Sequence, residues 1–482
     1  MDKIIKLPKI ICGEIIHDAD AGVHEIEYAH GVKVYIPRLT EADLQKIFEN
    51  RVRLHDISLG EITQYLRNSG MVLCDPEYGL RKEAAEYGSL ITGLSPEMIH
   101  RDFRTMSSYL KHRNVIYDLL DAELGTCRVI DEWVHNQVAR IRAFPRGRAL
   151  HILVGNVPIA GLYSILRSII TKNQTVVKLA RRDIISSLYF ALSLIKENSA
   201  MHLISRSMSV FYCDRHSSHL KKLMHTSDII CAWGQGGSME ALKQDVPYGV
   251  PFLEFCPKRS LSLVYLEDDT ALDKIAMRIA NDFSVYDQEA CFSPQHLFVI
   301  GDSNKLIPKI CQWLDLQTHL LPKGKMTPDI ASHVYRAKLE AQYRGWNVYE
   351  GANQEWLLID ANNPYLVTNH PLSRTIYVHA IQSPSEILPF VDDDTQTIGL
   401  YPLDKYMIEI ANLFCSKGAC RVCEIGLTSH FRQGFTHDGA YPLQQFVRMA
   451  YIDGGLEHVY KYGDYSLDDY EKMLFGAGLK GE

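Results

Sequence analysis

Short apolar runs alternate with amphipathic stretches through the middle of the chain. The runs lie at residues 149–154, 175–179 and 229–233, and the stretches that follow them lie at 159–171, 183–197 and 238–244. A short apolar run bounded by turn residues is typical of a buried strand, and a stretch with apolar residues every three or four positions is typical of a helix. Strands that alternate with helices predict a parallel sheet with crossover helices, so an α/β fold is expected.

A second series of the same kind begins near Lys258. Apolar runs at residues 261–266 and 297–300 begin it, and the run at 376–381 with the segment 383–391 continues it. A second α/β lobe is therefore expected. Upstream, the segment 126–147 alternates apolar and polar residues like an extended hairpin, and helical patterns occupy residues 41–50 and 96–112.

Composition agrees with two large lobes, because 482 residues with 46% hydrophobic content exceed one ordinary core. The net charge of −7 and the lack of a basic run disfavour nucleic acid as a partner. No apolar stretch approaches the ~20 residues of a transmembrane helix, and the first 18 residues lack the apolar centre of a signal peptide. Eleven scattered cysteines read as reduced thiols, so we expect a cytoplasmic protein.

Cys291 is the main candidate for chemistry, because it lies between two apolar segments downstream of an isolated acid, Glu254. A thiolate is a strong nucleophile toward carbonyl carbon and can hold an acyl group as a thioester. Glu254 has apolar neighbours, and burial would raise its pKa and suit it to proton transfer. Each residue alone also has a structural interpretation, as a buried small apolar side chain and as a buried acid satisfied by hydrogen bonds.

Asn156 and Lys178 lie at the ends of two predicted strands. Asn156 sits in a turn before a helix, where its amide could face a reacting carbonyl oxygen, although such residues also favour turns for backbone reasons. Lys178 is followed by Arg181 and Arg182 at a helix start. At the carboxyl end of a parallel strand, Lys178 could meet ribose hydroxyls and Arg181 could bind a 2′-phosphate; the alternative is a solvated helix start.

A glycine loop follows the apolar run at 229–233. Its residues are Gly234, Gly236, Gly237 and Ser238. A backbone without side chains can approach a pyrophosphate closely, and a helix N-terminus favours anions, although the loop is not a complete Gly-x-Gly-x-x-Gly motif. We reject a metal site at His216, His219 and His225, because their spacing with Cys213 fits no compact zinc pattern.

Taken in order, Asn156, Lys178, the 234–238 loop, Glu254 and Cys291 resemble the aldehyde dehydrogenase superfamily over about residues 125–455. The resemblance implies two parallel-sheet α/β lobes with a small β flap for oligomerisation. It implies Asn156 as the oxyanion donor, Lys178 as the ribose contact, Glu254 as the general base and Cys291 as the nucleophile. No residue is assigned to the nicotinamide ribose, because residues 371–376 lack the superfamily's Glu-x-Phe-Gly-Pro pattern.

A narrower likeness lies in residues 151–158, 253–260 and 421–426 and in the Thr-His-Asp-Gly of 436–439. These are similar to the acyl-CoA reductase family of bacterial bioluminescence, nearly end to end. The likeness implies reduction of a long-chain acyl thioester to a fatty aldehyde for luciferase. The acyl donor would be acyl-CoA or an acyl-protein synthetase, with the acyl-transferase of the fatty-acid reductase complex as a further partner. Arg181 replaces an acid that many superfamily members carry, which favours NADPH over NADH.

The resemblance also divides the chain. We expect a helical N-terminal part of the cofactor lobe (1–125), an oligomerisation hairpin (126–147), a nucleotide-binding domain (148–257), a catalytic domain (258–440) and a C-terminal segment returning to the cofactor lobe (441–482). The hairpin and the polar tail at 460–470 suggest a homo-oligomer docked to the synthetase. Two alternatives stay open: an aldehyde dehydrogenase working oxidatively with Glu254 activating water, and a non-catalytic scaffold of the same fold.

Overall fold

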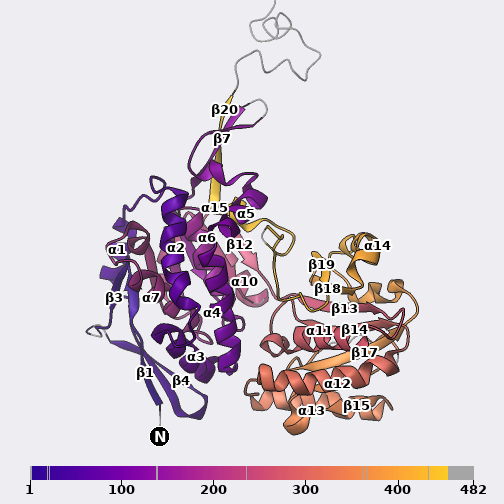
Figure 1. The fold of residues 1–482 in the computed structure, drawn as a ribbon. Coiled ribbons are helices and arrows are strands. Elements are labelled where there is room, and N and C mark those ends of the chain that lie inside the picture. The colour runs from indigo at the N-terminus through magenta and orange to yellow at the C-terminus, as the bar shows by residue number, and fades with distance from the viewer. Residues whose placement is uncertain are drawn as a thin grey trace, which may run out of the picture.

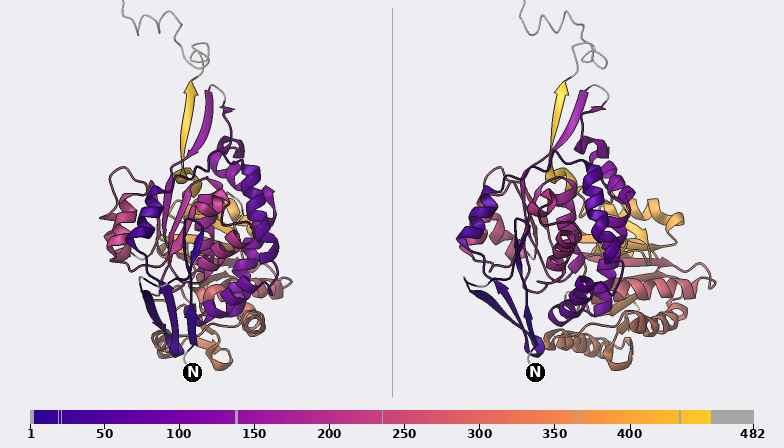
Figure 2. Two further views of the ribbon diagram at one scale, coloured as in Figure 1. Left: turned by 90° about the vertical axis from the view of Figure 1, so that its left-hand side faces the viewer. Right: turned by 60° about the vertical axis from the view of Figure 1, so that its left-hand side comes forward.

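The computed structural model describes residues 3–453 apart from 19, 21, 137, 138, 235, 362, 366, 368 and 433. The tail at 460–470 lies outside the described residues. Two α/β lobes stand side by side, and a small sheet projects from the first (Figures 1 and 2). The helices of the described ranges include none that is long and apolar enough to cross a bilayer.

The first lobe is built on a seven-stranded sheet in the order β12-β11-β8-β9-β10-β2-β3. Its parallel strands are β8 (Arg148–Ile152), β9 (Gln174–Lys178), β10 (Met208–Phe211), β11 (Ile229–Trp233) and β12 (Phe252–Phe255). The antiparallel edge is β2 (Lys9–Ile11) and β3 (Glu14–Ile16). The crossover helices are α6 (Pro158–Ile170), α7 (Ser186–Lys196), α8 (Leu203–Arg206), α9 (Ser218–His225) and α10 (Gly236–Lys243). The three predicted strand and helix pairs are confirmed.

The N-terminal part is less purely helical than its sequence suggests. A three-stranded sheet of β1 (Lys3–Lys6), β5 (Val32–Pro37) and β4 (Val23–Tyr28) precedes the helices. These strands are short and partly exposed, so their apolar pattern is weak. The helices are α1 (Glu41–Glu49), α2 (Leu59–Leu73), α3 (Gly79–Thr92), α4 (Pro96–Lys111) and α5 (Arg113–Leu124). Capping boxes at Thr40 and Ser58 fix the starts of α1 and α2.

The second lobe holds another seven-stranded sheet in the order β15-β16-β17-β14-β13-β18-β19. The strands are β13 (Arg259–Tyr265), β14 (Pro294–Ile300), β15 (Asn347–Glu350), β16 (Leu357–Asp360), β17 (Thr375–Ile381), β18 (Thr395–Tyr401) and β19 (Arg421–Glu424), parallel except at β15. The helices are α11 (Leu272–Ser284), α12 (Ser303–Leu320), α13 (Pro328–Tyr343) and α14 (Leu403–Cys415). Residues Pro384–Phe390 form a 3-10 helix after β17.

The projecting sheet consists of β6 (Val134–Asn136), β7 (Ala139–Pro145) and β20 (Val447–Asp453), antiparallel in the order β20-β7-β6 (Figure 1). Short helix α15 (Pro442–Phe446) leads the chain back to β20 from the second lobe. The expectation of extended backbone from residue 126 is wrong at Cys127–Ile130. These four residues form a 3-10 helix, because the Thr126 hydroxyl accepts a hydrogen bond from the backbone N–H of Arg128.

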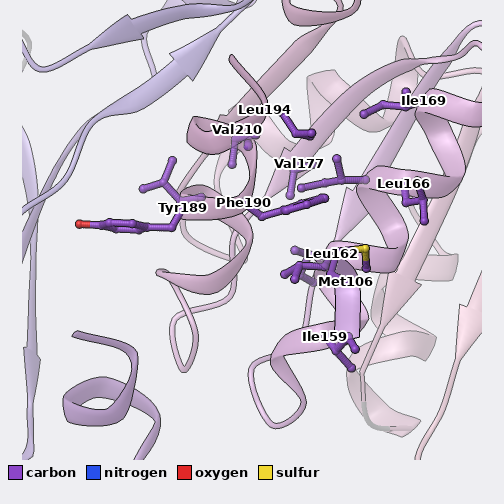
Figure 3. Packing of buried hydrophobic residues seen from close by; sticks show 14 of the residues in the cluster. Met106, Ile159, Leu162, Leu166, Ile169, Val177, Tyr189, Phe190, Leu194 and Val210 are labelled. Atoms are coloured by element: carbon purple, nitrogen blue, oxygen red, sulfur yellow. The ribbon is translucent and has the colours of Figure 1, made fainter. Parts of the chain in front are cut away.

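Helix α6 is the centre of the core of the first lobe. Its apolar residues pack between Met106 of α4 and residues of α7 and the sheet (Figure 3); those labelled are Ile159, Leu162, Leu166, Ile169, Val177, Tyr189, Phe190, Leu194 and Val210. Nearly every side chain of α6 is buried, which is why this helix reads as continuously apolar. Its packing fixes the loop at 154–157 that precedes it.

Candidate active site

A cavity of about 720 Å³ is lined by residues of both lobes. The lining includes five of the predicted site residues: Asn156, Lys178, Gly234, Ser238 and Cys291. Strand ends of the first sheet supply one side, and the loop between α11 and β14 supplies the other. The cavity therefore brings together positions that are up to 135 residues apart in sequence, from Asn156 to Cys291.

Cys291 lies half-buried in the loop before β14. Its Sγ accepts a hydrogen bond from Gln396 Nε2 at 3.0 Å, and its carbonyl oxygen accepts one from Ser260 Oγ at 2.7 Å. Burial, and after it the neighbouring Asp438 carboxylate, raise the pKa of the Cys291 thiol to about 12. The resting side chain at neutral pH is therefore the thiol, and its activation needs a stabilising donor or a bound group.

The chain reaches Cys291 through three left-handed residues: Tyr286, Asp287 and Gln288 have φ of 51°, 49° and 69°. A non-glycine residue in this region costs about 1–3 kcal/mol and persists only where the surrounding structure imposes it. Here it does, because Asp287 accepts hydrogen bonds from Arg374 Nε at 2.6 Å and from the N–H of Gly324 at 2.8 Å. The backbone before the nucleophile is thus held in a shape that it would not adopt alone.

Gln288 locks the same loop to β17. Its Oε1 accepts from the N–H of Thr375 at 2.7 Å, and its Nε2 donates to the carbonyl oxygens of Thr375 and Pro294. Residues 372–374 are also left-handed, and the Ser373 N–H donates to the Asp287 carbonyl. Residues 371–376 thus position the nucleophile loop, a role that their sequence did not reveal.

Asp102, on α4, links the loop before Cys291 to the start of helix α6, which follows Asn156. Its carboxylate accepts hydrogen bonds from the Tyr286 hydroxyl and from the N–H of Ile159 in the first turn of α6. Burial raises the pKa of Asp102 to about 7. One buried carboxyl group therefore ties the nucleophile loop to the helix that follows Asn156.

Asn156 faces the nucleophile loop. Its Nδ2 donates to the carbonyl oxygen of Glu289 at 3.0 Å, two residues before Cys291, and its Oδ1 is buried without a partner in the described part of the chain. The Glu289 carboxylate pairs with Arg182 at 2.6 Å, and burial raises its pKa. The amide thus stands beside the loop that carries the thiol.

Lys178, Arg215 and Ser238 contribute polar groups to the lining of the cavity. Lys178 ends β9, and burial lowers its pKa; its Nζ lies 5.7 Å from the Tyr212 ring centroid. Arg215 donates from Nη1 to Ser238 Oγ at 2.9 Å. Arg215 was missed because the strand before it, β10, was not recognised from the sequence. Arg215 lies in the loop after the carboxyl end of this parallel strand, four residues beyond Phe211, where a ligand contact is expected.

Arg181 and two of the loop glycines do not line the cavity. Arg181 is exposed, whereas its neighbour Arg182 lines the cavity and pairs with Glu289. Gly236 and Gly237 are exposed in the first turn of α10, and a Cβ added at either would meet no atom within 4 Å. The space beside this helix start is therefore open to an approaching anion.

Glu254 does not occupy the interior position expected for it. On β12 the neighbouring Phe255 lines the cavity, so Glu254 points to the opposite face, where its side chain is 38% exposed and pairs with Lys243 at 2.7 Å. The expectation failed because β12 is the edge strand of its sheet. Apolar neighbours on an edge strand do not imply that the residue between them is enclosed.

The cavity lining also contains several aromatic side chains. Phe431 lies between Phe292 and Phe435, with ring centroids 5.2 and 4.3 Å away, and Phe255 stacks on Trp233 at 4.1 Å. All five rings project from loops or strand ends, so sequence periodicity could not assign them to one wall.

A buried cation lies beside this wall. Arg167 donates from Nη2 to His437 Nδ1 at 3.4 Å, and its Nη1 has no partner among residues that the structure describes. Because a guanidinium only donates, Nδ1 must accept, and the proton of the neutral imidazole lies on Nε2. Burial lowers the pKa of His437, so the ring stays neutral at pH 7.

Comparison with known proteins shows the family to which the chain belongs. The model of the acyl-CoA reductase (LuxC) family matches residues 54–449. The chain belongs to the acyl-CoA reductase (LuxC) family. As a member it is an oxidoreductase of acyl groups. Its relatives include the long-chain acyl-protein thioester reductases of Photobacterium phosphoreum, 31% identical over 96% of this chain and 93% of that protein, and of Vibrio harveyi, 33% identical over 92% of each.

Solved structures confirm the fold class of this LuxC-family chain. Aldehyde dehydrogenase 21 from Physcomitrella patens superposes with a TM-score of 0.69 at 13% identity, covering 94% of this chain and 98% of that one. The NADP-dependent glyceraldehyde-3-phosphate dehydrogenase from Bacillus halodurans gives a TM-score of 0.69 at 15% identity, covering 93% and 99%. The aldehyde dehydrogenase architecture predicted from five motifs is therefore correct.

Proposed function

We propose that this protein reduces a long-chain acyl thioester to a fatty aldehyde with NADPH, through an acyl group carried on Cys291, and that the aldehyde serves bacterial luminescence. The observation that carries the proposal is the position of the Cys291 thiol in a cavity whose lining includes both cationic and aromatic side chains. The cationic groups suit a phosphorylated cofactor and the aromatic groups suit an acyl chain. The curated relatives are named as reductases of this kind.

The residues present fit a nicotinamide cofactor. Lys178 has no acceptor for its ammonium group among the described residues, and the start of α10 leaves room for a pyrophosphate beside Ser238. Lys178 would hold ribose hydroxyls and the N–H groups of α10 would hold phosphate. When bound, the cofactor supplies the hydride.

The remaining steps belong to the side chains of this protein. The Cys291 thiolate attacks the acyl carbonyl and expels the donor thiol, with Asn156 and a backbone N–H holding the oxyanion. After reduction the carbon–sulfur bond breaks, its electron pair returns to sulfur, and a proton from water regenerates the thiol. No step requires Glu254, whose usual task of activating water would hydrolyse the thioester.

The position of Glu254 supports the reductive direction over the oxidative alternative. A dehydrogenase that makes acid needs a base beside the thioester, whereas Glu254 pairs with Lys243 and does not line the cavity. Incubation with tetradecanal and NADP distinguishes the two. Rapid acid formation would favour the oxidative enzyme.

Mass spectrometry of the intact protein tests the proposal directly. Exposure to myristoyl-CoA is expected to add one acyl group that neutral hydroxylamine removes, and subsequent NADPH is expected to release tetradecanal. A scaffold without chemistry would show no adduct, and absence of an adduct contradicts the proposed function.

Cofactor selectivity offers a further prediction. Arg215 is expected to bind the 2′-phosphate of NADPH, so Arg215→Ala should raise the KM for NADPH by roughly 10- to 100-fold and leave that for NADH nearly unchanged, because a charge-assisted hydrogen bond contributes ~1.5–3 kcal/mol. Arg181→Glu is the comparison variant. If Arg181 selects the cofactor, as its sequence position suggests, that variant will show the larger change. Initial rates measured over a range of NADPH and of NADH concentrations give the KM of each variant for each cofactor.

We also propose a homo-oligomer that pairs through the projecting sheet and works with the synthetase and acyl-transferase of a fatty-acid reductase complex. Strand β20 exposes Met449, Tyr451 and Ile452, which are 49, 56 and 45% accessible. Exposed apolar residues on such a sheet suit a subunit contact. Deleting the β6–β7 hairpin is expected to give monomers in sedimentation and slower acyl transfer from the synthetase. An unchanged, fully active oligomer would assign the sheet another role.

A further inference from the structure

Gln396, on β18, is the side chain that touches the sulfur of Cys291. Its Nε2 lies 3.0 Å from Cys291 Sγ and 2.7 Å from Asp438 Oδ1. The side-chain amide has two N–H groups, so one can donate to each acceptor. Gln396 is buried, and Asp438 lines the cavity that holds Cys291.

Asp438 decides which end of the amide faces the thiol. An ionised carboxylate only accepts hydrogen bonds, so it selects the NH₂ end of Gln396 and excludes the flipped amide. Gln396 Oε1 is buried and has no hydrogen-bond partner in the described ranges. Burial raises the pKa of Asp438, while the hydrogen bond from Gln396 and the charges of Lys258 and Arg167 act in the opposite direction and favour the carboxylate.

The proposed reaction requires that the negative charge on the sulfur of Cys291 be stabilised. When the reduced acyl carbon releases sulfur, the electron pair of the carbon–sulfur bond becomes a thiolate within a buried site that already contains the Asp438 carboxylate. A donor 3.0 Å from sulfur offsets that repulsion. The same donor favours the thiolate that attacks the next acyl group.

We propose that Gln396 is a catalytic residue that stabilises the thiolate of Cys291 by donating a hydrogen bond to sulfur, and that Asp438 is the positioning residue that fixes its amide. The proposal deepens the function proposed above and rests on it for the leaving-group step. Its first test needs neither acyl donor nor cofactor.

The test is the alkylation rate of Cys291 by iodoacetamide, measured on its own peptide because ten other cysteines are present. Below the thiol pKa, this rate follows the fraction of thiolate. Gln396→Met has a similar length without the N–H groups, and should lower the rate about tenfold at every pH between 7 and 9. Gln382→Met, an exposed glutamine of the same lobe, should leave the rate unchanged.

Gln396→Asn is a second variant that tests the same contact in case Gln396→Met does not fold. It keeps an amide but withdraws it by one methylene, so it should also slow alkylation. Both variants should slow aldehyde formation by roughly 10- to 100-fold with little change in NADPH binding, because the lost bond is to the leaving sulfur. Normal alkylation in both folded variants would overturn the proposal. Failure of the wild-type protein to form an acyl adduct would instead overturn the proposed function.

A double-mutant cycle tests Asp438. In the Gln396→Met background, Asp438→Asn removes only a negative charge and should speed alkylation. With Gln396 present, the same change also releases the amide, so the acceleration should be smaller or reversed. A difference between the two backgrounds of about threefold or more supports positioning through Gln396. Equal effects would show that Asp438 acts by charge alone.

Discussion

Cys291→Ala is expected to lose acyl transfer and aldehyde formation together, by at least about a thousandfold, because the covalent carrier is removed. The acyl group should no longer appear on the protein after exposure to a radioactive acyl donor. NADPH binding should persist, since no cofactor contact proposed above involves this thiol. Labelling followed by gel electrophoresis, with fluorescence titration of NADPH in parallel, measures both properties.

Two variants sharpen this result. Cys291→Ser should accept the acyl group slowly, because a hydroxyl is a weaker nucleophile at neutral pH and its ester a poorer hydride acceptor. Cys256→Ala is the matched control, since Cys256 also lines the cavity. It should keep the label. Full labelling of Cys291→Ala combined with loss in Cys256→Ala would transfer the role to the second thiol.

Arg374→Met is expected to destabilise the protein by ~3–5 kcal/mol, the cost of leaving one member of a buried ion pair without its partner. Arg374 is fully buried, with Nε 2.6 Å from Asp287 and Nη2 2.8 Å from the Leu321 carbonyl. The substitution leaves the buried Asp287 carboxylate, in the loop before Cys291, without its ion-pair partner. Urea denaturation followed by tryptophan fluorescence measures the loss.

An exposed arginine provides the control for this measurement. Arg344→Met breaks an i,i+4 pair with Glu340 on the surface and the contacts of Arg344 with Trp346 and Tyr365, which together contribute about 1–2 kcal/mol. The double variant Asp287→Asn with Arg374→Met should recover part of the stability, because no buried charge remains. If Arg374→Met unfolds no earlier than Arg344→Met, the ion pair is not what holds the loop.

The elements that could be predicted from the sequence are those with a strong and regular apolar pattern. Strands β8, β9 and β11 are buried on both faces, so they read as continuous apolar runs. Strand β4 alternates exposed and buried residues over a short length, and its signal is lost among polar neighbours. The edge position of β12 depends on the order of strands, which single-sequence patterns do not contain.

Site residues could be predicted from the sequence where the residue type and its position at the end of a predicted strand were sufficient to identify them. Cys291, Asn156 and Lys178 line the cavity as expected from local motifs. Asp102 and Gln396 were not found, because their partners lie 184 and 105 residues away in sequence. No local pattern marks an aspartate on a helix, or a glutamine on a strand, as a neighbour of the nucleophile loop.

The left-handed loop before Cys291 also links the two lobes. Tyr286 is bonded to Asp102 of the first lobe, and the next residue, Asp287, is bonded to Arg374 of the second. Separating the lobes at this point would break the Tyr286–Asp102 bond or pull the loop away from Arg374, and either change would displace the backbone that leads to the thiol. An opening motion that keeps both bonds would pivot near this loop, so that the thiol stays in place while more distant parts of the cavity widen to exchange cofactor and acyl chain.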